Sequence, residues 1–180
     1  QIYTGAISEQ TGAYLQDQIS FGNLRVSIGG RYDWASDDTT NLITNTPNAY
    51  SADAFTWRAG GVYLFDNGLA PYFSYSESFL PQLVDPSGTL GGVLFEPTTG
   101  EQYEAGLRYQ AGNGIYLTAG AFEITQQNVP VRDPNGTLCG RLVCQIQAGE
   151  ARVRGLEFES RASLTQGTTL IASASHLDAK

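Results

Sequence analysis

Apolar and polar residues alternate along most of the chain. In the clearest stretch, Leu24 to Trp34, every second side chain is apolar or glycine, and the residues between include two arginines and an aspartate. Successive side chains of a strand point to opposite faces of a sheet, so a period of two predicts a strand with one apolar and one polar face. The same alternation runs through residues 69–76, 102–109 and 155–164. The pattern predicts an all-β protein.

Turn residues divide the chain into eight predicted strands and leave no convincing helix. Asp66-Asn67-Gly68 is a strong hairpin signal, because Asn and Gly accept the positive φ of tight turns. Three similar short turns lie at 21–23, 111–114 and 165–167, whereas the other connections are long, at 36–52, 80–98 and 130–147. We expect antiparallel strands at 11–20, 24–35, 53–65, 69–79, 99–110, 115–129, 148–163 and 168–178.

The regular exchange of short and long connections is typical of a transmembrane β-barrel. Lipid offers no hydrogen bonds, so the strands pair all round, with apolar side chains outward and polar ones in the lumen. Short turns then lie on the periplasmic side and long loops outside the cell. Aromatic residues near strand ends, such as Trp34 and Tyr75, suit the belts at the two membrane interfaces. A soluble β-sandwich also alternates and is the alternative fold.

Composition excludes some classes of function. Ten Lys and Arg stand against 18 Asp and Glu, for a net charge of −8, which argues against nucleic-acid binding. Charged residues make up only 16%, and no run of 18 apolar residues predicts a transmembrane helix. Low charge, 21 Gly and 10 Tyr fit a β protein that faces lipid on one side.

The predicted topology indicates a part of a larger barrel. If the first strand descends to the turn at Gly22, the eighth strand ascends, and both chain ends lie on the side of the long loops. A complete small bacterial barrel normally begins and ends in the periplasm. We therefore expect residues 1–180 to be about eight strands cut from a larger barrel.

Six runs, in order and covering nearly the whole chain, resemble the barrel of TonB-dependent siderophore receptors, and most closely their ferrichrome-type branch. They are TGAYLQDQ (11–18), GGRYD (29–33), GLAPYFSYSESF (68–79), PTTGEQYE (97–104), GEARVRGLE (149–157) and HLDAK (176–180). Each run alone is weak, and their combination in this order is specific.

The resemblance implies an outer-membrane transporter of a Gram-negative bacterium that binds a ferric siderophore, of the hydroxamate type, and imports it with energy from TonB. Such receptors are barrels of about 22 strands with a plugged lumen. Neither a plug nor a TonB box is recognised in these residues, so we expect a middle-to-late barrel segment, with the TonB complex acting through the plug. Iron arrives already chelated, so no cofactor and no protein ligands to iron are expected.

Two sets of residues are candidates for this function. The first is a set of lumen charges that face the plug, or alternatively pair with one another in a solvated barrel interior: Arg58, Glu104, Arg108, Arg154, Glu157 and Glu159. The second consists of aromatic residues that contact the ligand at the barrel mouth, or alternatively pack the loops: Trp34, Tyr50, Tyr75, Phe79 and Phe95. Trp34 and Tyr75 are equally candidates for an interfacial belt.

The remaining polar motifs point to structure rather than catalysis. Cys139 and Cys144 lie in one loop, and an oxidising compartment favours a local disulfide between them. His176, the only histidine, would have to serve any Ser-His-Asp site, and the Ser173 and Ser175 nearby occur commonly by chance. We therefore expect no enzyme. Two other functions stay open: a small complete outer-membrane barrel with a structural or adhesive role, and an outer-membrane hydrolase.

Overall fold

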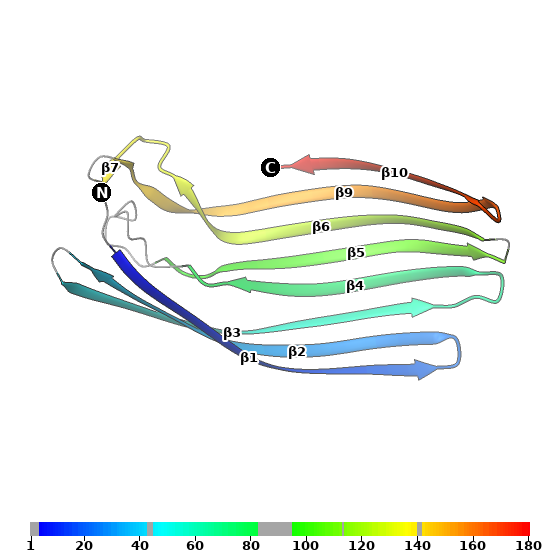
Figure 1. Cartoon of the computed structure of the whole chain (residues 1–180), viewed down its shortest axis with the longest axis horizontal. Coiled ribbons are helices and arrows are strands. Elements are labelled where there is room, and N and C mark those ends of the chain that lie inside the picture. Colours follow the sequence, from blue (N-terminus) through cyan, green and yellow to red (C-terminus); the bar gives the residue numbers. More distant parts are fainter. Residues whose placement is uncertain (1–3, 43–44, 83–94, 113, 140–141) are drawn as a thin grey trace.

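The computed structural model describes residues 4–42, 45–82, 95–112, 114–139 and 142–180. They form one antiparallel sheet of eight strands in the order β1-β2-β3-β4-β5-β6-β9-β10, with a small separate hairpin, β7–β8 (Figure 1). The strands are β1 (Thr4–Phe21), β2 (Leu24–Asn41), β3 (Thr46–Tyr63), β4 (Leu69–Leu80), β5 (Thr98–Ala111), β6 (Ile115–Arg132), β7 (Leu138–Cys139), β8 (Leu142–Val143), β9 (Gln145–Thr165) and β10 (Thr168–Ala179). Within the described part of the chain, no helix is long and apolar enough to cross a membrane.

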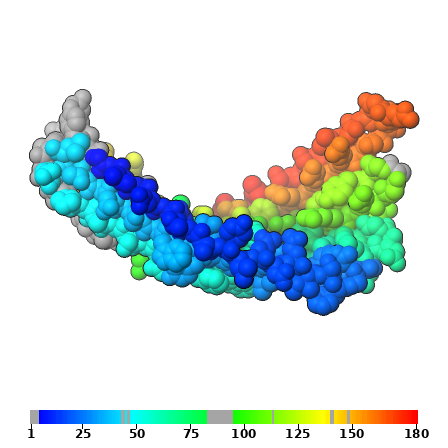
Figure 2. All heavy atoms as spheres, turned by 60° about the horizontal axis from the view of Figure 1, so that its bottom comes forward, coloured from blue at the N-terminus to red at the C-terminus, as the bar shows by residue number. Residues whose placement is uncertain are grey.

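The predicted order of eight antiparallel strands is confirmed. The four short turns lie together at one end of the sheet, on the right in Figure 1, and the long connections lie at the other. Gly68 shows why such a turn needs glycine, since its φ is +86° and an added Cβ would lie 2.1 Å from the carbonyl oxygen of Gln110. The sheet is open and curved like a trough, as Figure 2 shows, and β1 does not pair with β10.

Two predicted loops are largely strand. The sequence assigns 36–52 to a loop, but β2 continues to Asn41 and β3 begins at Thr46, and the two strands stay paired throughout. The loop at 130–147 likewise contains the ends of β6 and β9 and the β7–β8 hairpin. Both β2 and β3 have 18 residues. A strand needs only about 9–11 residues to cross a bilayer, so both strands extend well beyond the membrane.

The two faces of the sheet differ in chemistry, as the alternation predicts. One face, here called the polar face, carries Arg31, Asp33, Arg58, Glu104 and Glu157, which the strand register places on the same side. The opposite, apolar face carries Leu107, Leu156 and Phe158 with most of the aromatic rings. Among the described residues the only buried apolar side chains are Ala35, Phe95 and Cys144, so this single-layered sheet has no core of its own.

The ladder between β3 and β4 is much shorter than its neighbours. It runs only from Arg58, opposite Ser76, to Val62, opposite Tyr72, whereas β2 and β3 pair over their whole length. Beyond Arg58, the ends of β1–β3 diverge from β4, and Figure 1 shows the two groups of strands splaying apart toward the long connections. The extracellular end of the sheet is therefore divided between β3 and β4.

Tyr72 lies flat against the polar face where two glycines meet. Gly106 and Gly120 are direct cross-strand partners, and a Cβ on Gly106 would lie 2.5 Å from the Ala119 carbonyl oxygen and 2.7 Å from the Tyr72 ring. Gly149, also within a strand, has no atom within 4 Å of such a Cβ. The ring thus occupies the space that side chains would fill at the glycine pair.

We predict that Gly106→Ala destabilises the full-length protein by about 1–3 kcal/mol, the usual cost of forcing extra volume into a filled site. The matched control Gly149→Ala, which meets open space, should have a much smaller effect. Thermal unfolding of both variants in detergent, followed by circular dichroism, tests this, and equal losses in the two variants would contradict it.

Candidate functional site on the polar face and its mouth

Five of the six predicted lumen charges share the polar face. Glu157 and Glu159 on β9 are two strands away from Gly106 and Arg108 on β5 in the strand register. A shallow groove of about 450 Å³ lies between them, lined by Tyr72, Glu104, Arg108, Gly120, Glu157 and Glu159. Three carboxylates and one guanidinium therefore meet around one hollow, which leaves the groove with an excess of negative charge.

Tyr72 organises this groove, although the sequence analysis did not single it out. Its hydroxyl donates a hydrogen bond of 2.6 Å to Oε1 of Glu104, and the guanidinium carbon of Arg108 lies 4.5 Å from the centre of its ring. A cation over an aromatic face is attracted by the ring quadrupole. The Tyr72 side chain therefore contacts both the Glu104 carboxylate and the Arg108 guanidinium. The signal in the sequence was its place in the polar row of the alternation over residues 69–76.

Arg58 reaches across a neighbouring strand. Gly29 lies between Arg58 on β3 and Gln16 on β1 in the register, and the Arg58 guanidinium donates a hydrogen bond to Oε1 of Gln16 over it. Because Gly29 has no side chain, this bond can link three strands on the polar face.

Arg154 is the exception among the predicted lumen charges. The register places it on the apolar face, opposite Glu123, and the two side chains form an ion pair. The assignment of Arg154 to the lumen therefore does not fit the structure. The alternation that turns Leu156 and Phe158 outward also turns Arg154 outward, so the sequence did contain this signal.

The predicted mouth aromatics separate between the two faces. Tyr50 lies on the polar face opposite Asp37, and Phe95 is buried beside the start of β5. The Tyr50 hydroxyl oxygen is also buried, and within the described residues it has no hydrogen-bond partner. Trp34, Tyr75 and Phe79 lie on the apolar face.

Trp34 and Tyr75 belong to an aromatic belt on the apolar face, which we call the outer belt: Tyr32, Trp34, Trp57, Tyr75 and Tyr103. Its rings touch in pairs with centroids 4.6–4.8 Å apart. The Tyr32 and Tyr75 hydroxyls donate hydrogen bonds to Asp53 and Glu77, respectively. Apolar rings with hydroxyls that reach charged groups are characteristic of the membrane interface. The placement favours the belt interpretation of Trp34 and Tyr75.

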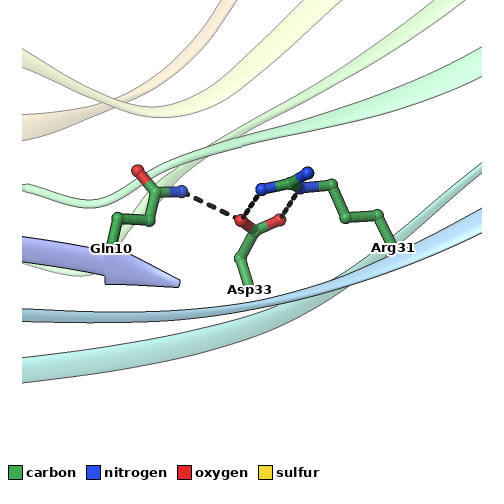
Figure 3. Close-up of polar contacts among 3 residues, drawn as sticks. All are labelled: Gln10, Arg31 and Asp33. Atoms are coloured by element: carbon green, nitrogen blue, oxygen red, sulfur yellow. Dashed lines mark hydrogen bonds and ion pairs between the residues drawn. The ribbon is translucent and has the colours of Figure 1, made fainter. Parts of the chain in front are cut away.

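Toward the extracellular end of β1 and β2, a buried carboxylate is held from two sides (Figure 3). Arg31 donates two hydrogen bonds to Asp33, of 2.6 Å from Nε to Oδ2 and 2.7 Å from Nη2 to Oδ1. Gln10 on β1 donates a third, 3.1 Å long, to Oδ1. The Asp33 side chain is only 6% exposed. Its charge is thus fully compensated, and the group ties β1 to β2 beside the mouth.

A disulfide closes the small hairpin beyond β6. Cys139 and Cys144 are bonded, which is the pairing that the sequence favours. At the base of this hairpin, Asp133 accepts hydrogen bonds from Thr137 and from the backbone N–H of Asn135, and these bonds hold the pKa of Asp133 below its usual value. The hairpin is therefore fixed by a covalent bond and a capped turn.

The residues that a Ser-His-Asp hydrolase site would have to use do not converge. His176 is opposite Leu156 on the apolar face, whereas the register turns Ser173 and Ser175 to the polar face. Among the described residues, no three His, Cys, Asp or Glu side chains are grouped so that they could hold a metal ion.

Comparison with known proteins agrees with the arrangement of the strands. The family model described as "TonB dependent receptor-like, beta-barrel" matches residues 1–180. The chain is 39% identical over 175 residues to the ferrichrome outer membrane transporter/phage receptor of Escherichia coli, covering 96% of this chain and 22% of that protein. It is 33% identical to the ferrioxamine B receptor of Salmonella typhimurium, covering 94% and 23%.

Solved structures show the same fold. The alcaligin outer-membrane receptor FauA from Bordetella pertussis superposes with a TM-score of 0.77 at 24% identity, over 98% of this chain and 31% of that one. The siderophore receptor PiuA from Acinetobacter baumannii has a TM-score of 0.77 at 25% identity, over 98% and 26%. The chain spans about a quarter of the length of the curated relatives it matches.

We predict that Arg31→Met destabilises the full-length protein by about 1–3 kcal/mol, because it leaves the buried Asp33 carboxylate without its ionic partner. The double variant Arg31→Met/Asp33→Leu, which removes both charges, should recover part of that loss. Unfolding in denaturant measures both. A double variant that is less stable than Arg31→Met would contradict this account.

We also predict that loss of the disulfide loosens only the hairpin. Closing so short a loop stabilises it by about 2 kcal/mol in the chain-entropy model. Limited proteolysis of Cys139→Ser/Cys144→Ser should show faster cleavage within 133–144, read by mass spectrometry, with an unchanged melting temperature of the barrel. Equal cleavage rates with and without the disulfide would refute this expectation.

Proposed function

Because the chain belongs to the TonB-dependent receptor β-barrel family, we propose that the full-length protein imports a ferric siderophore across the outer membrane with energy from TonB. The chain is a segment of an outer-membrane protein of a Gram-negative bacterium. The observation that carries the proposal is the 39% identity to a ferrichrome transporter over 96% of this chain.

The substrate is a hydroxamate siderophore in this proposal. The ligands named for two relatives, ferrichrome and ferrioxamine B, are both iron chelates of hydroxamates. Their iron is already enclosed by oxygen atoms of the chelator, so the receptor needs to recognise only the outer surface of the complex. Iron is therefore cargo and not a cofactor.

Tyr50 and Phe95 are the mouth residues that we assign to ligand contact. Both lie at the extracellular end of the sheet, and the buried Tyr50 hydroxyl has no partner among the described residues. A hydroxyl that lacks a partner can donate to a carbonyl or hydroxamate oxygen of the siderophore, and the mostly buried Phe95 adds an apolar ring at the same end of the sheet.

The five charges on the polar face, Arg58, Glu104, Arg108, Glu157 and Glu159, are assigned to the lumen wall that faces the plug. A negative groove in a confined lumen requires compensating positive charge, and a plug inside the barrel can supply it. A small complete barrel with an adhesive role is not favoured by the relatives, which are receptors and transporters. The same comparison supports a transporter rather than an enzyme.

We predict that deletion of the gene abolishes growth on ferrichrome or ferrioxamine B as the sole iron source, and that the full-length gene restores growth only in a strain with intact TonB. Uptake of ⁵⁵Fe-labelled siderophore measures the same loss directly. A ferric catecholate serves as the specificity control.

The possible results separate the parts of the proposal. Restored uptake without TonB would refute energised transport. Uptake of the catecholate but not of either hydroxamate would retain transport and refute the assigned class of siderophore.

A further inference from the structure

Residue Asn128 has an unusual backbone conformation within β6. Its φ is +59°, and it is one of two non-glycine residues with positive φ in the described part of the chain. This left-handed conformation is unfavourable for residues with a Cβ, although Asn tolerates it better than most. Its persistence within a strand means that surrounding contacts compensate for it, and such sites are often functional.

Three hydrogen bonds of Asn128 reach the segment that leads into β5. Its side-chain amide donates to the Pro97 carbonyl oxygen at 3.2 Å and to Oε2 of Glu96 at 3.4 Å. Its own carbonyl oxygen accepts a bond of 3.0 Å from the Thr98 hydroxyl. The unusual backbone therefore turns both polar ends of Asn128 toward residues 96–98.

Gln147 on β9 holds the same segment. Its side-chain amide accepts a hydrogen bond from the Glu96 backbone N–H at 3.0 Å and donates one to the Glu96 carbonyl oxygen at 2.6 Å. The same nitrogen donates to the Asn128 carbonyl oxygen at 3.0 Å. A side chain here pairs with both backbone groups of Glu96, as a neighbouring strand would. We call Asn128 and Gln147 the clamp.

The clamped segment lies where the ladder between β3 and β4 has ended. Phe95, directly before Glu96, is 7% exposed, and Thr98, directly after Pro97, is 8% exposed. On the other side, Glu96 lies near enough to Tyr50 of β3 to interact with it electrostatically. The clamp thus sets the position of Phe95 and Glu96 relative to Tyr50, across the part of the sheet that lies beyond the end of the β3–β4 ladder.

We propose that Asn128 and Gln147 are positioning residues for siderophore binding, in an inference that rests on the function proposed above. They do not touch the ligand. They hold residues 95–98 against β6 and β9, so that Phe95 and Glu96 are already fixed at the mouth, on the side toward Tyr50, when the ferric hydroxamate arrives. A surface ordered before binding loses less conformational entropy when the ligand binds.

Two variants of the full-length receptor remove the clamp without disturbing the strands. Gln147→Met keeps the length of the side chain and loses its three hydrogen bonds. Asn128→Gly keeps the positive φ and the carbonyl acceptor and loses the side-chain amide. Gln145→Met is the matched control, because Gln145 is on the same strand and its side chain makes none of the hydrogen bonds of the clamp.

The readouts are hydrogen exchange of the Glu96 amide and the affinity for ferrichrome and ferrioxamine B, measured by tryptophan fluorescence. In each clamp variant we expect faster exchange at Glu96 and a Kd about tenfold higher, the size of effect that losing one or two hydrogen bonds produces. Because both side chains act on Glu96, the double variant should be less impaired than the product of the two single effects. TonB-dependent uptake at saturating siderophore should be unchanged.

The outcomes distinguish this inference from the function on which it rests. Faster exchange at Glu96 with an unchanged Kd would show that the clamp only stabilises the fold, and would overturn the inference alone. Lower uptake at saturating siderophore with normal affinity would also overturn it. A wild-type receptor that binds neither siderophore would overturn the proposed function, and the inference with it.

Discussion

The structure depends on one constraint, that every backbone N–H and C=O within the membrane must find a partner in the protein. A sheet one layer thick meets it by pairing each strand with both neighbours, and no internal apolar core is required. Only Ala35, Phe95 and Cys144 are buried apolar residues in the described chain. Lipid covers the apolar face instead, which leaves the other face free to carry charge.

Glycines recur where a large side chain lies flat on this thin sheet. Tyr72 lies over Gly106 and Gly120 on the polar face, and the Phe55 ring lies over Gly30 on the apolar face, 2.9 Å from the site of a Cβ. Rings placed over strand glycines restore the packing that glycine lacks. On the polar face, a ring that lies flat on the sheet projects less far into the lumen than a ring that stands upright. The lumen is therefore narrowed less.

The predictions from sequence succeeded where lipid imposes a period of two and failed where it does not. The eight strands and four short turns are as predicted because one face must be apolar within the membrane. The run Ser36–Asn41 is polar on both faces, so its alternation of apolar and polar residues disappears although its backbone is still paired. The clamp of Asn128 and Gln147 consists of side-chain bonds to distant backbone groups, which leave no local pattern. The face of Arg154 could have been predicted by continuing the alternation of Leu156 and Phe158 toward the start of β9.

The extension of β2 and β3 beyond the membrane determines how this mouth can change in evolution. In a true loop, gain or loss of one residue displaces only a few neighbours. Here the same event within 36–41 or 46–52 would shift a hydrogen-bonded register and exchange the two faces of the ribbon beyond that point. Length variation between homologues should therefore concentrate at residues 42–45, where the two strands are joined.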